Sequence, residues 1–394
     1  MSLFADPSFR RIWFAGLASG VVRWLEVLAF GAFAYATTES AFIVVILTML
    51  RQLPMALLGV FVGALADRLD GRRVQIAGYL IMLTQTVVLG SLAVSGRLEV
   101  WHLAIAAFLS GSFWTGDNPV RRTMLGEAAG SGRLGIAMSI DASTNNFTRM
   151  LGPALGGGLL ALIGIKGAFL LSGSFYLLGL AAMLRLSWHR PVTVLGGPGL
   201  LASMRGGLGL LRGDRRLQGV LAITAIYNIF GWPAASLIPV IGRDDLGLGL
   251  ALVGLMQSVE GAGAFLCGIV AGVMVKERHY MRLYLGGAIC FQLAMIAFAL
   301  TPIPLPAYLA WLVAGLGSAA VGAMQPTLVL IYAPSEARGR MMGLLSVSQG
   351  TGLLGFLLLS PLPALIGAAP AVLAIGLLGL AGIAASCIWW RELR

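Results

Sequence analysis

The sequence has few charged residues and few residues that could carry chemistry. Charged residues fill 11% of its 394 positions, whereas a soluble domain has about 25%, so water is not the main solvent of this chain. Only three cysteines and three histidines occur. The cysteines lie within apolar runs, where they act as small apolar side chains, and no histidine has a partner at metal-ligand spacing. We therefore expect no disulfide, metal site or redox centre.

Motifs of enzymes and of nucleic-acid-binding proteins are also absent. The sequence contains no G-x-S-x-G, no H-E-x-x-H and no P-loop, so neither a common hydrolase nor ATP-driven transport is indicated. The net charge of +11 is scattered between apolar runs instead of forming a nucleic-acid-binding motif. We expect no enzyme, no nucleic-acid partner and no cofactor, with a proton gradient as the driving force.

Apolar residues are abundant, at 58%. A helix that crosses the hydrocarbon needs about 20 of them in a row. Runs of roughly this length predict an all-α membrane protein with twelve transmembrane helices, at 12–36, 41–66, 74–95, 100–122, 134–161, 167–186, 217–241, 249–274, 281–301, 306–331, 341–366 and 369–389. The first run is too long for the apolar part of a cleaved signal peptide, so we expect it to be a span.

The basic residues predict the orientation. With the N-terminus inside, the outer loops keep only Arg97, Lys166 and Arg243, and the positive-inside rule is obeyed. We expect a multi-pass protein of the inner (cytoplasmic) membrane that is a monomer, with both termini in the cytoplasm.

The chain also repeats itself. The polar, glycine-rich stretch 187–216 is expected to be a cytoplasmic linker between two six-helix bundles, 1–186 and 217–394. Corresponding features lie 205 to 209 positions apart, namely Arg10-Arg11 with Arg215-Arg216, Gly63 with Gly272, Asn118-Pro119 with Gln325-Pro326, and Pro153 with Pro361. Two pseudo-symmetric halves in parallel orientation are typical of one large class of secondary transporters.

The segment from Gly63 to Arg73, GALADRLDGRR, resembles the signature loop of the major facilitator superfamily. The resemblance implies a conformational latch that includes Gly63, Asp67, Arg68, Gly71, Arg72 and Arg73. In such a latch, the aspartate meets the N-terminal dipole of the span 341–366, and the arginines pair with carboxylates. The second half has no aspartate at the equivalent place, so we expect any latch there to be weaker.

A second motif lies in the span 134–161. Gly152, Pro153, Gly156 and Gly157 resemble the core of the motif that marks antiporters of this superfamily, although Thr148 stands where the longer motif has glycine. The alternative is a proline kink flanked by glycines for close helix packing. The whole chain is similar to the enterobactin-exporter and drug-proton antiporter branch.

Ionisable residues near the middle of a span are expensive and are candidates for function. Five occur, Arg23 and Glu26 in the first span and Arg51, Arg149 and Glu260 elsewhere. Arg23 and Glu26 are three apart on one helix and can interact directly, either as a structural ion pair or as part of the transport pathway.

Asp141, Asn145 and Arg149 share one helix face and form a polar stripe, which either lines a water-filled path or binds a neighbouring helix. The five central groups carry a net charge of +1, which favours an anionic solute. We expect Arg149 and Arg51 to contact its anionic group, and Glu26, Glu260 or Asp141 to carry the proton.

Further pathway candidates are polar or aromatic. By resemblance, the first, fourth, seventh and tenth spans line the central cavity. The candidates are Trp114, Asn118, Tyr227, Asn228, Trp232, Gln257, Gln325 and Gln349. Trp114 could instead be an interfacial belt residue.

The expected function is secondary transport of a small organic solute, anionic or amphipathic, by alternating access. Proton-coupled export of a drug or siderophore, as by a multidrug antiporter, fits the resemblance. The alternatives are an importer of an anionic metabolite or siderophore, a lipid or lysolipid translocator, and a non-transporting membrane receptor.

Overall fold

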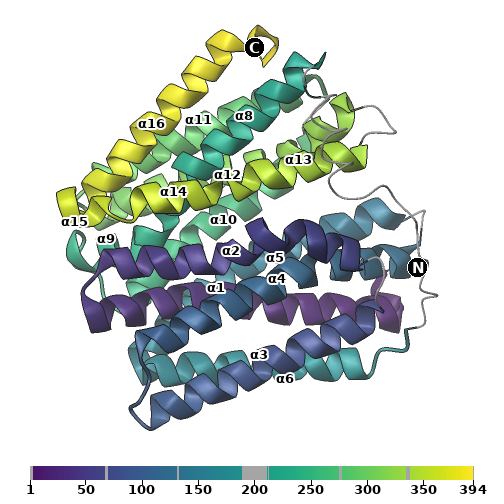
Figure 1. Cartoon of the computed structure of the whole chain (residues 1–394), viewed down its shortest axis with the longest axis vertical. Helices are drawn as coiled ribbons and strands as arrows, with labels where there is room; N and C mark the ends of the chain where they lie inside the picture. The colour runs from purple at the N-terminus through teal and green to yellow at the C-terminus, as the bar shows by residue number, and fades with distance from the viewer. Residues whose placement is uncertain are drawn as a thin grey trace. The chain divides into compact units, whose positions relative to one another are not determined.

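The computed structural model describes residues 3–66, 70–130, 133–188, 211, 213–274, 277–333 and 338–393, and within these the regular elements are all helices (Figure 1). Nine stretches of this described part are long and apolar enough to cross a membrane. The predicted spans 41–66, 100–122 and 134–161 are not among the nine. In the first of these the apolar helix counted is Ala41–Leu57, and the other two carry charged residues inside them, such as Asp117 and Asp141.

The first six predicted spans are each a single helix. They are α1 (Pro7–Thr38), α2 (Ala41–Ala66), α3 (Gly71–Val94), α4 (Val100–Ala129), α5 (Leu134–Ile163) and α6 (Ile165–Leu184). Most begin or end a few residues beyond the apolar run, because polar residues continue a helix outside the hydrocarbon. Of these, α3 and α6 lie side by side along their length (Figure 1).

Four of the last six predicted spans are also single helices: α10 (Leu250–Met274), α11 (Tyr280–Ala299), α12 (Pro304–Tyr332) and α16 (Ala368–Trp389). The other two are split. The span 217–241 becomes α8 (Arg215–Phe230), a 3-10 turn η3 (Trp232–Leu237) and α9 (Ile238–Asp244), and 341–366 becomes α13 (Arg338–Gly350), α14 (Gly352–Leu359) and α15 (Leu362–Ile366).

The breaks have a local cause in the sequence. Gly231 and Pro233 stand at the first break, and Pro361 precedes α15. Proline has no backbone N–H to donate and glycine resists helix formation, so the helix of each span is interrupted where these residues occur.

The chain forms two compact units. The first contains Met1–Thr37, Leu50–Gly196 and Gly249–Ser258, and the second contains Thr38–Met49, Gly197–Leu248 and Val259–Arg394. The division of the sequence at 186 and 216 stays a prediction.

A buried tyrosine bond recurs in both units. The hydroxyl of Tyr79 in α3 donates to the carbonyl oxygen of Ala15 in α1 at 2.6 Å, and that of Tyr284 in α11 donates to the carbonyl oxygen of Val220 in α8 at 2.9 Å. Both donors and both acceptors are 205 positions apart. The repeat seen in the sequence is therefore also a repeat of contacts.

Arginine caps recur in the same way. Arg11 donates to the carbonyl oxygen of Arg185 at the end of α6, and Arg215 donates to that of Trp389 at the end of α16. These pairs are 204 positions apart. The last carbonyls of a helix have no partner within the helix, so each arginine satisfies one and places positive charge at the negative end of the dipole.

Close helix approaches bring polar side chains together at two places. A Cβ atom on Gly111 of α4 would overlap the carbonyl oxygen of Arg51 in α2, and one on Gly315 of α12 would overlap that of Glu260 in α10. Each glycine thus lets the backbone of a charged residue approach the neighbouring helix, and a serine of that helix, Ser110 or Ser318, takes part in the polar contacts there.

Candidate functional site

Two arginines and two tryptophans gather inside the first unit, on α1, α4 and α5. The guanidinium carbon of Arg23 lies 3.3 Å from the ring centre of Trp114 and 4.8 Å from that of Trp24. That of Arg149 lies 5.3 Å from the same Trp24 ring. All four side chains are half-buried. These are cation–π contacts, and they place Trp114 against a candidate pathway residue.

Glu26 pairs with Arg51, and no ion pair with Arg23 is found in the described part of the chain. A carboxylate oxygen of Glu26 lies 3.6 Å from an Nη of Arg51. The Glu26 carboxylate also accepts hydrogen bonds from Ser110 at 3.0 Å and Tyr176 at 3.5 Å. The expected contact between Arg23 and Glu26 is therefore replaced, because α2 brings a second guanidinium to the same carboxylate.

The polar chain at Glu26 continues outward to Gln85 of α3. The Gln85 amide nitrogen donates to Ser110 at 3.2 Å, and Ser110 in turn donates to Glu26. The Gln85 carbonyl oxygen is buried without a hydrogen-bond partner among the described residues. A buried carboxylate in the unit is thus two hydrogen bonds away from a side chain on the α3–α4 seam.

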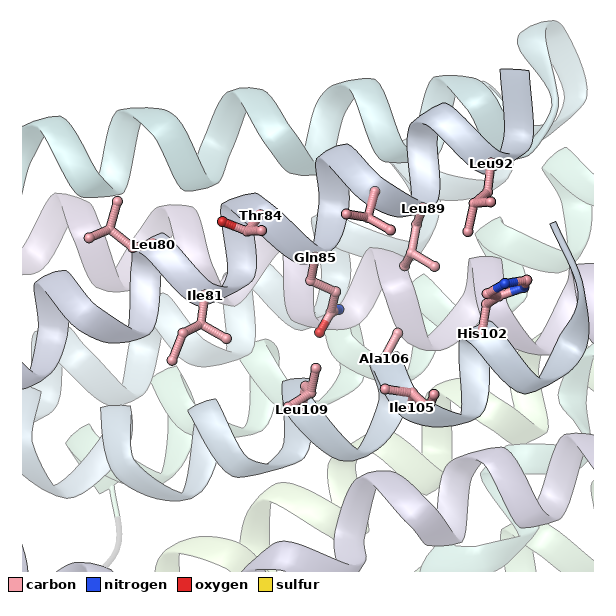
Figure 2. Close-up of a pocket in the computed structure, with 11 residues that line it drawn as sticks. Leu80, Ile81, Thr84, Gln85, Leu89, Leu92, His102, Ile105, Ala106 and Leu109 are labelled. Carbon is pink, nitrogen blue, oxygen red and sulfur yellow. The ribbon is translucent and has the colours of Figure 1, made fainter. Parts of the chain in front are cut away.

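A groove of about 480 Å³ follows this seam (Figure 2). Apolar side chains of α3 and α4, such as Leu89 and Leu109, line it, with Gln85 between them and His102 at one end. A second hollow of about 360 Å³ continues along the same seam past Asp117. None of the predicted pathway residues lines either hollow.

Asp141 lies in a cluster with arginines of α4. Its two carboxylate oxygens accept hydrogen bonds from Arg121 and Arg122, the latter at 2.8 Å, and Arg121 also bonds Asp117 at 3.3 Å. The stripe on α5 is thus divided. Asp141 binds a neighbouring helix, the second alternative for the stripe, while Arg149 stacks on α1.

Two predicted residues with amide side chains remain in the first unit, Asn145 and Asn118. Asn145 is half-buried, and its backbone carbonyl oxygen accepts a hydrogen bond from the Thr148 hydroxyl at 2.9 Å. Asn118 is half-buried, and its side-chain oxygen is without a hydrogen-bond partner among the described residues.

In the second unit the central carboxylate also meets a serine. Ser318 of α12 donates to Glu260 at 2.7 Å, and Glu260 is buried. Nearby in sequence, Gln349 of α13 donates its amide nitrogen to the Gln325 side chain of α12 at 3.0 Å. The structure therefore joins two predicted pathway residues of different spans.

The remaining pathway candidates include Tyr227 and Asn228, which contact an aromatic ring and a backbone carbonyl oxygen. Tyr227 is buried and packs edge-on against Phe291, with ring centres 5.0 Å apart. Asn228 donates to the carbonyl oxygen of Thr224 at 2.8 Å. Trp232 begins η3, and Gln257 of α10 has a buried side-chain oxygen without a hydrogen-bond partner in the described residues.

The signature loop is described in part. Asp67 and Arg68 lie outside the described residues, and Gly63 is placed only as a residue of α2. Arg73 pairs with Asp70 at 3.7 Å. For Arg72, the partners are carbonyl oxygens at the end of α6, those of Met183 at 3.1 Å and Leu184 at 2.8 Å, instead of the expected carboxylates.

Glycines of this region pack closely. A Cβ atom on Gly71 would lie 3.0 Å from the sulfur of Met124, so α3 begins tightly against α4. In the antiporter-like motif, Cβ atoms on Gly152 and Gly156 would lie 2.7 and 3.3 Å from atoms of Trp24 and Leu25 in α1.

The same motif contains Pro153, which lies inside α5, and Gly157, where an added Cβ would lie 2.8 Å from Gly254. The motif thus provides close packing against α1. This geometry is the one described by the alternative interpretation, a proline flanked by glycines for close helix packing. Packing by itself does not distinguish an antiporter from another transporter.

Several partners were not predicted from the sequence. Four of them join the predicted residues through contacts between helices: Ser110, Tyr176, Gln85 and Arg121. The fifth, Trp24, contacts Arg23 of its own helix and Arg149 of α5. Trp24 alone had a usable signal, because it adjoins Arg23 in the sequence. The described residues contain no group of three His, Cys, Asp or Glu side chains that could hold a metal ion.

A family profile described as "Transmembrane secretion effector" matches residues 1–387. The chain belongs to this family of the major facilitator superfamily. The expectation that the chain belongs to the major facilitator superfamily, a group of transporters and not of enzymes, is therefore confirmed.

Curated relatives are distant members. An uncharacterized MFS-type transporter, YfiS, of Bacillus subtilis is 26% identical over 69% of this chain and 65% of its own length. Macrolide efflux protein A of Streptococcus pyogenes is 21% identical over 67% of this chain and 66% of its own. The Staphyloferrin A transporter of Staphylococcus aureus is 27% identical over 43% of each. The match thus covers slightly less than two thirds of the first two relatives.

Solved structures confirm the fold. A peptide transporter in complex with sulfate superposes with a TM-score of 0.77 at 13% identity, over 98% of this chain and 94% of that one. The nucleoside transporter NupG gives 0.75 at 10% identity, over 98% and 99%. The predicted all-helical major facilitator fold of a multi-pass membrane protein is therefore confirmed.

Proposed function

We propose that this secondary transporter exports a small organic solute, anionic or amphipathic, in exchange for protons. The observation that carries the proposal is the pair of arginines, Arg23 and Arg149, inside membrane-spanning helices of the first unit. Guanidinium groups stay charged, and burying one is costly without an acceptor. An anionic solute that binds there supplies an acceptor to Arg23, whose contacts among the described residues are the rings of Trp114 and Trp24.

The direction is supported by names of the family and its relatives. The family is described as a secretion effector, and one relative is named for macrolide efflux. The relative named a Staphyloferrin A transporter supports a siderophore as an alternative solute. Import of an anionic metabolite or siderophore is the second candidate, because the same arginines would serve either direction.

Glu260 is the proposed proton carrier. It is a buried carboxylate at the centre of its span and accepts a hydrogen bond from a neutral hydroxyl, that of Ser318. Glu26 has Arg51 beside it, and both oxygens of Asp141 are occupied by arginines. These two carboxylates are therefore assigned to structure and not to proton transfer.

The proposed setting is the inner membrane, with a monomer whose termini are both cytoplasmic. The arginines at the start of α1 and α8, and Arg72 and Arg73 in the first turn of α3, support this orientation by the positive-inside rule.

Flux into proteoliposomes tests the proposal. The purified full chain is reconstituted, and uptake of labelled anionic, cationic and zwitterionic amphiphiles is measured with and without a proton gradient that is acidic inside the liposomes. The proposal expects gradient-stimulated flux of an anionic amphiphile, and loss of that stimulation in Glu260→Gln. If none of the three classes is transported, the result contradicts transport of an organic solute. A lipid translocator or a receptor would give this result.

A further inference from the structure

The arginines inside the helices of the first unit are of two kinds. Arg51, Arg121 and Arg122 each contact a carboxylate, from Glu26, Asp117 or Asp141. Arg23 is different: within the described part of the chain, its contacts are the rings of Trp114 and Trp24. Its charge is therefore held in place without being neutralised by a neighbouring side chain.

Stacking determines which part of Arg23 remains available. A guanidinium that lies over an aromatic ring uses its flat face, and its N–H groups point outward in the plane. At 3.3 Å from the centre of the Trp114 ring, Arg23 is fixed in this way. Its five N–H donors form a fork that matches the two oxygens of a carboxylate or phosphate.

Arg149 adds a second positive charge at the same ring. Its guanidinium carbon lies 5.3 Å and that of Arg23 lies 4.8 Å from the Trp24 centre, so the two carbons are at most about 10 Å apart, which is about one Debye length at 0.1 M salt. Both side chains are half-buried, whereas Arg51 is 9% exposed and faces Glu26. Arg23 and Arg149 are therefore more exposed than Arg51.

We propose that Arg23 and Arg149 form the binding site for the oxyanion of the transported solute, and that Trp24 and Trp114 contact its flat apolar body. This inference rests on the proposed function and narrows it to an oxyanion attached to an aromatic or other apolar group. It assigns Arg51 a different role from the one expected from the sequence, since Arg51 neutralises Glu26 instead of contacting the solute.

The test compares two probes that differ in charge only, 1-naphthoate and its neutral amide, 1-naphthamide. Binding to the purified full chain is measured by the rise in melting temperature with ligand concentration. The inference expects saturable binding of naphthoate and weaker binding of naphthamide. Hydrogen bonds to charged groups predict a rise of about 10- to 100-fold in the apparent Kd of naphthoate in Arg23→Gln and in Arg149→Gln.

Variants of matched charge provide the controls. Arg97→Gln removes an exposed arginine of the loop between α3 and α4 and is expected to leave the Kd unchanged. Arg23→Lys keeps the charge but loses the fork and the stack, so it is expected to bind better than Arg23→Gln and worse than the parent chain. If Arg23→Gln does not fold, the naphthoate Kd values of Arg23→Lys and Arg149→Gln still test the oxyanion site.

The outcomes separate this inference from the proposed function. Equal binding of naphthoate and naphthamide, or an unchanged Kd in Arg23→Lys and Arg149→Gln, overturns the oxyanion site. If proteoliposomes then still carry a cationic or neutral amphiphile, transport of organic solutes stands and only the assigned site is wrong. If no solute is carried at all, the proposed function fails first.

Discussion

Replacement of Glu26 by Gln is expected to lower the free energy of unfolding by about 3–5 kcal/mol. The change keeps the shape of the side chain but leaves Arg51 as a buried guanidinium without its ion-pair partner. At the observed 3.6 Å and an effective dielectric constant of about 20, the Coulomb attraction is roughly 5 kcal/mol. Losing one partner of a buried pair costs about 3–5 kcal/mol.

The measurement is reversible unfolding in mixed micelles of a neutral detergent and dodecyl sulfate. Arg51→Met and the double variant Glu26→Gln/Arg51→Met complete a double-mutant cycle. The double variant is expected to be more stable than the sum of the two single losses predicts, by about 2 kcal/mol or more, because it no longer buries an unpaired charge. Asp245→Asn, at an exposed aspartate after α9, is the control and should change stability by less than about 0.5 kcal/mol.

One result would refute this reasoning. If Glu26→Gln loses less than about 1 kcal/mol and the cycle is additive, then Glu26 does not neutralise Arg51. Arg51 would then again be available as a contact for the solute.

Three further predictions, with five variants, test the packing and the caps. Tyr79→Phe removes the buried hydrogen bond to Ala15, and Tyr284→Phe removes those to Val220 and Thr224, so they should cost about 1 and about 2 kcal/mol of unfolding free energy in the same micelles; no loss in either variant would contradict the shared role of the tyrosines. Gly111→Ala places a Cβ against the α2 backbone and should cost about 1–3 kcal/mol, while Gly158→Ala, where a Cβ meets open space, should be neutral or slightly stabilising. Arg72→Gln removes two bonds to the end of α6, and faster hydrogen exchange in the last turn of α6 should follow.

The order and extent of the helices could be predicted because they depend on local sequence. The length of an apolar run is a local property of the sequence, and it predicted ten of the helices as single elements. Gly231 and Pro233 stand at the break that follows α8, but the sequence did not predict a break there. Proline also occurs inside intact helices of this chain, as Pro153 does in α5.

The partners of the buried charges could not be predicted. Sequence spacing shows only neighbours on the same helix, so Glu26 was expected to interact with Arg23, three positions away. The observed partner, Arg51, comes from another helix at a point where Gly111 lets the backbones of α2 and α4 meet. Asp141 shows the same limit, because both of its partners belong to α4.

The tyrosine bonds that recur 205 positions apart indicate the history of this chain. A bond that joins corresponding helices through corresponding residues in both halves is best explained by descent from one ancestral half that was duplicated. Ser110 and Ser318 correspond at 208 positions, and Arg51 and Glu260 at 209. Each serine donates to a buried glutamate, Ser110 to Glu26 of α1 and Ser318 to Glu260 of α10. These glutamates lie on helices that do not correspond between the halves, so the duplicated frame kept its serine while the acid that the serine binds came to stand on another helix.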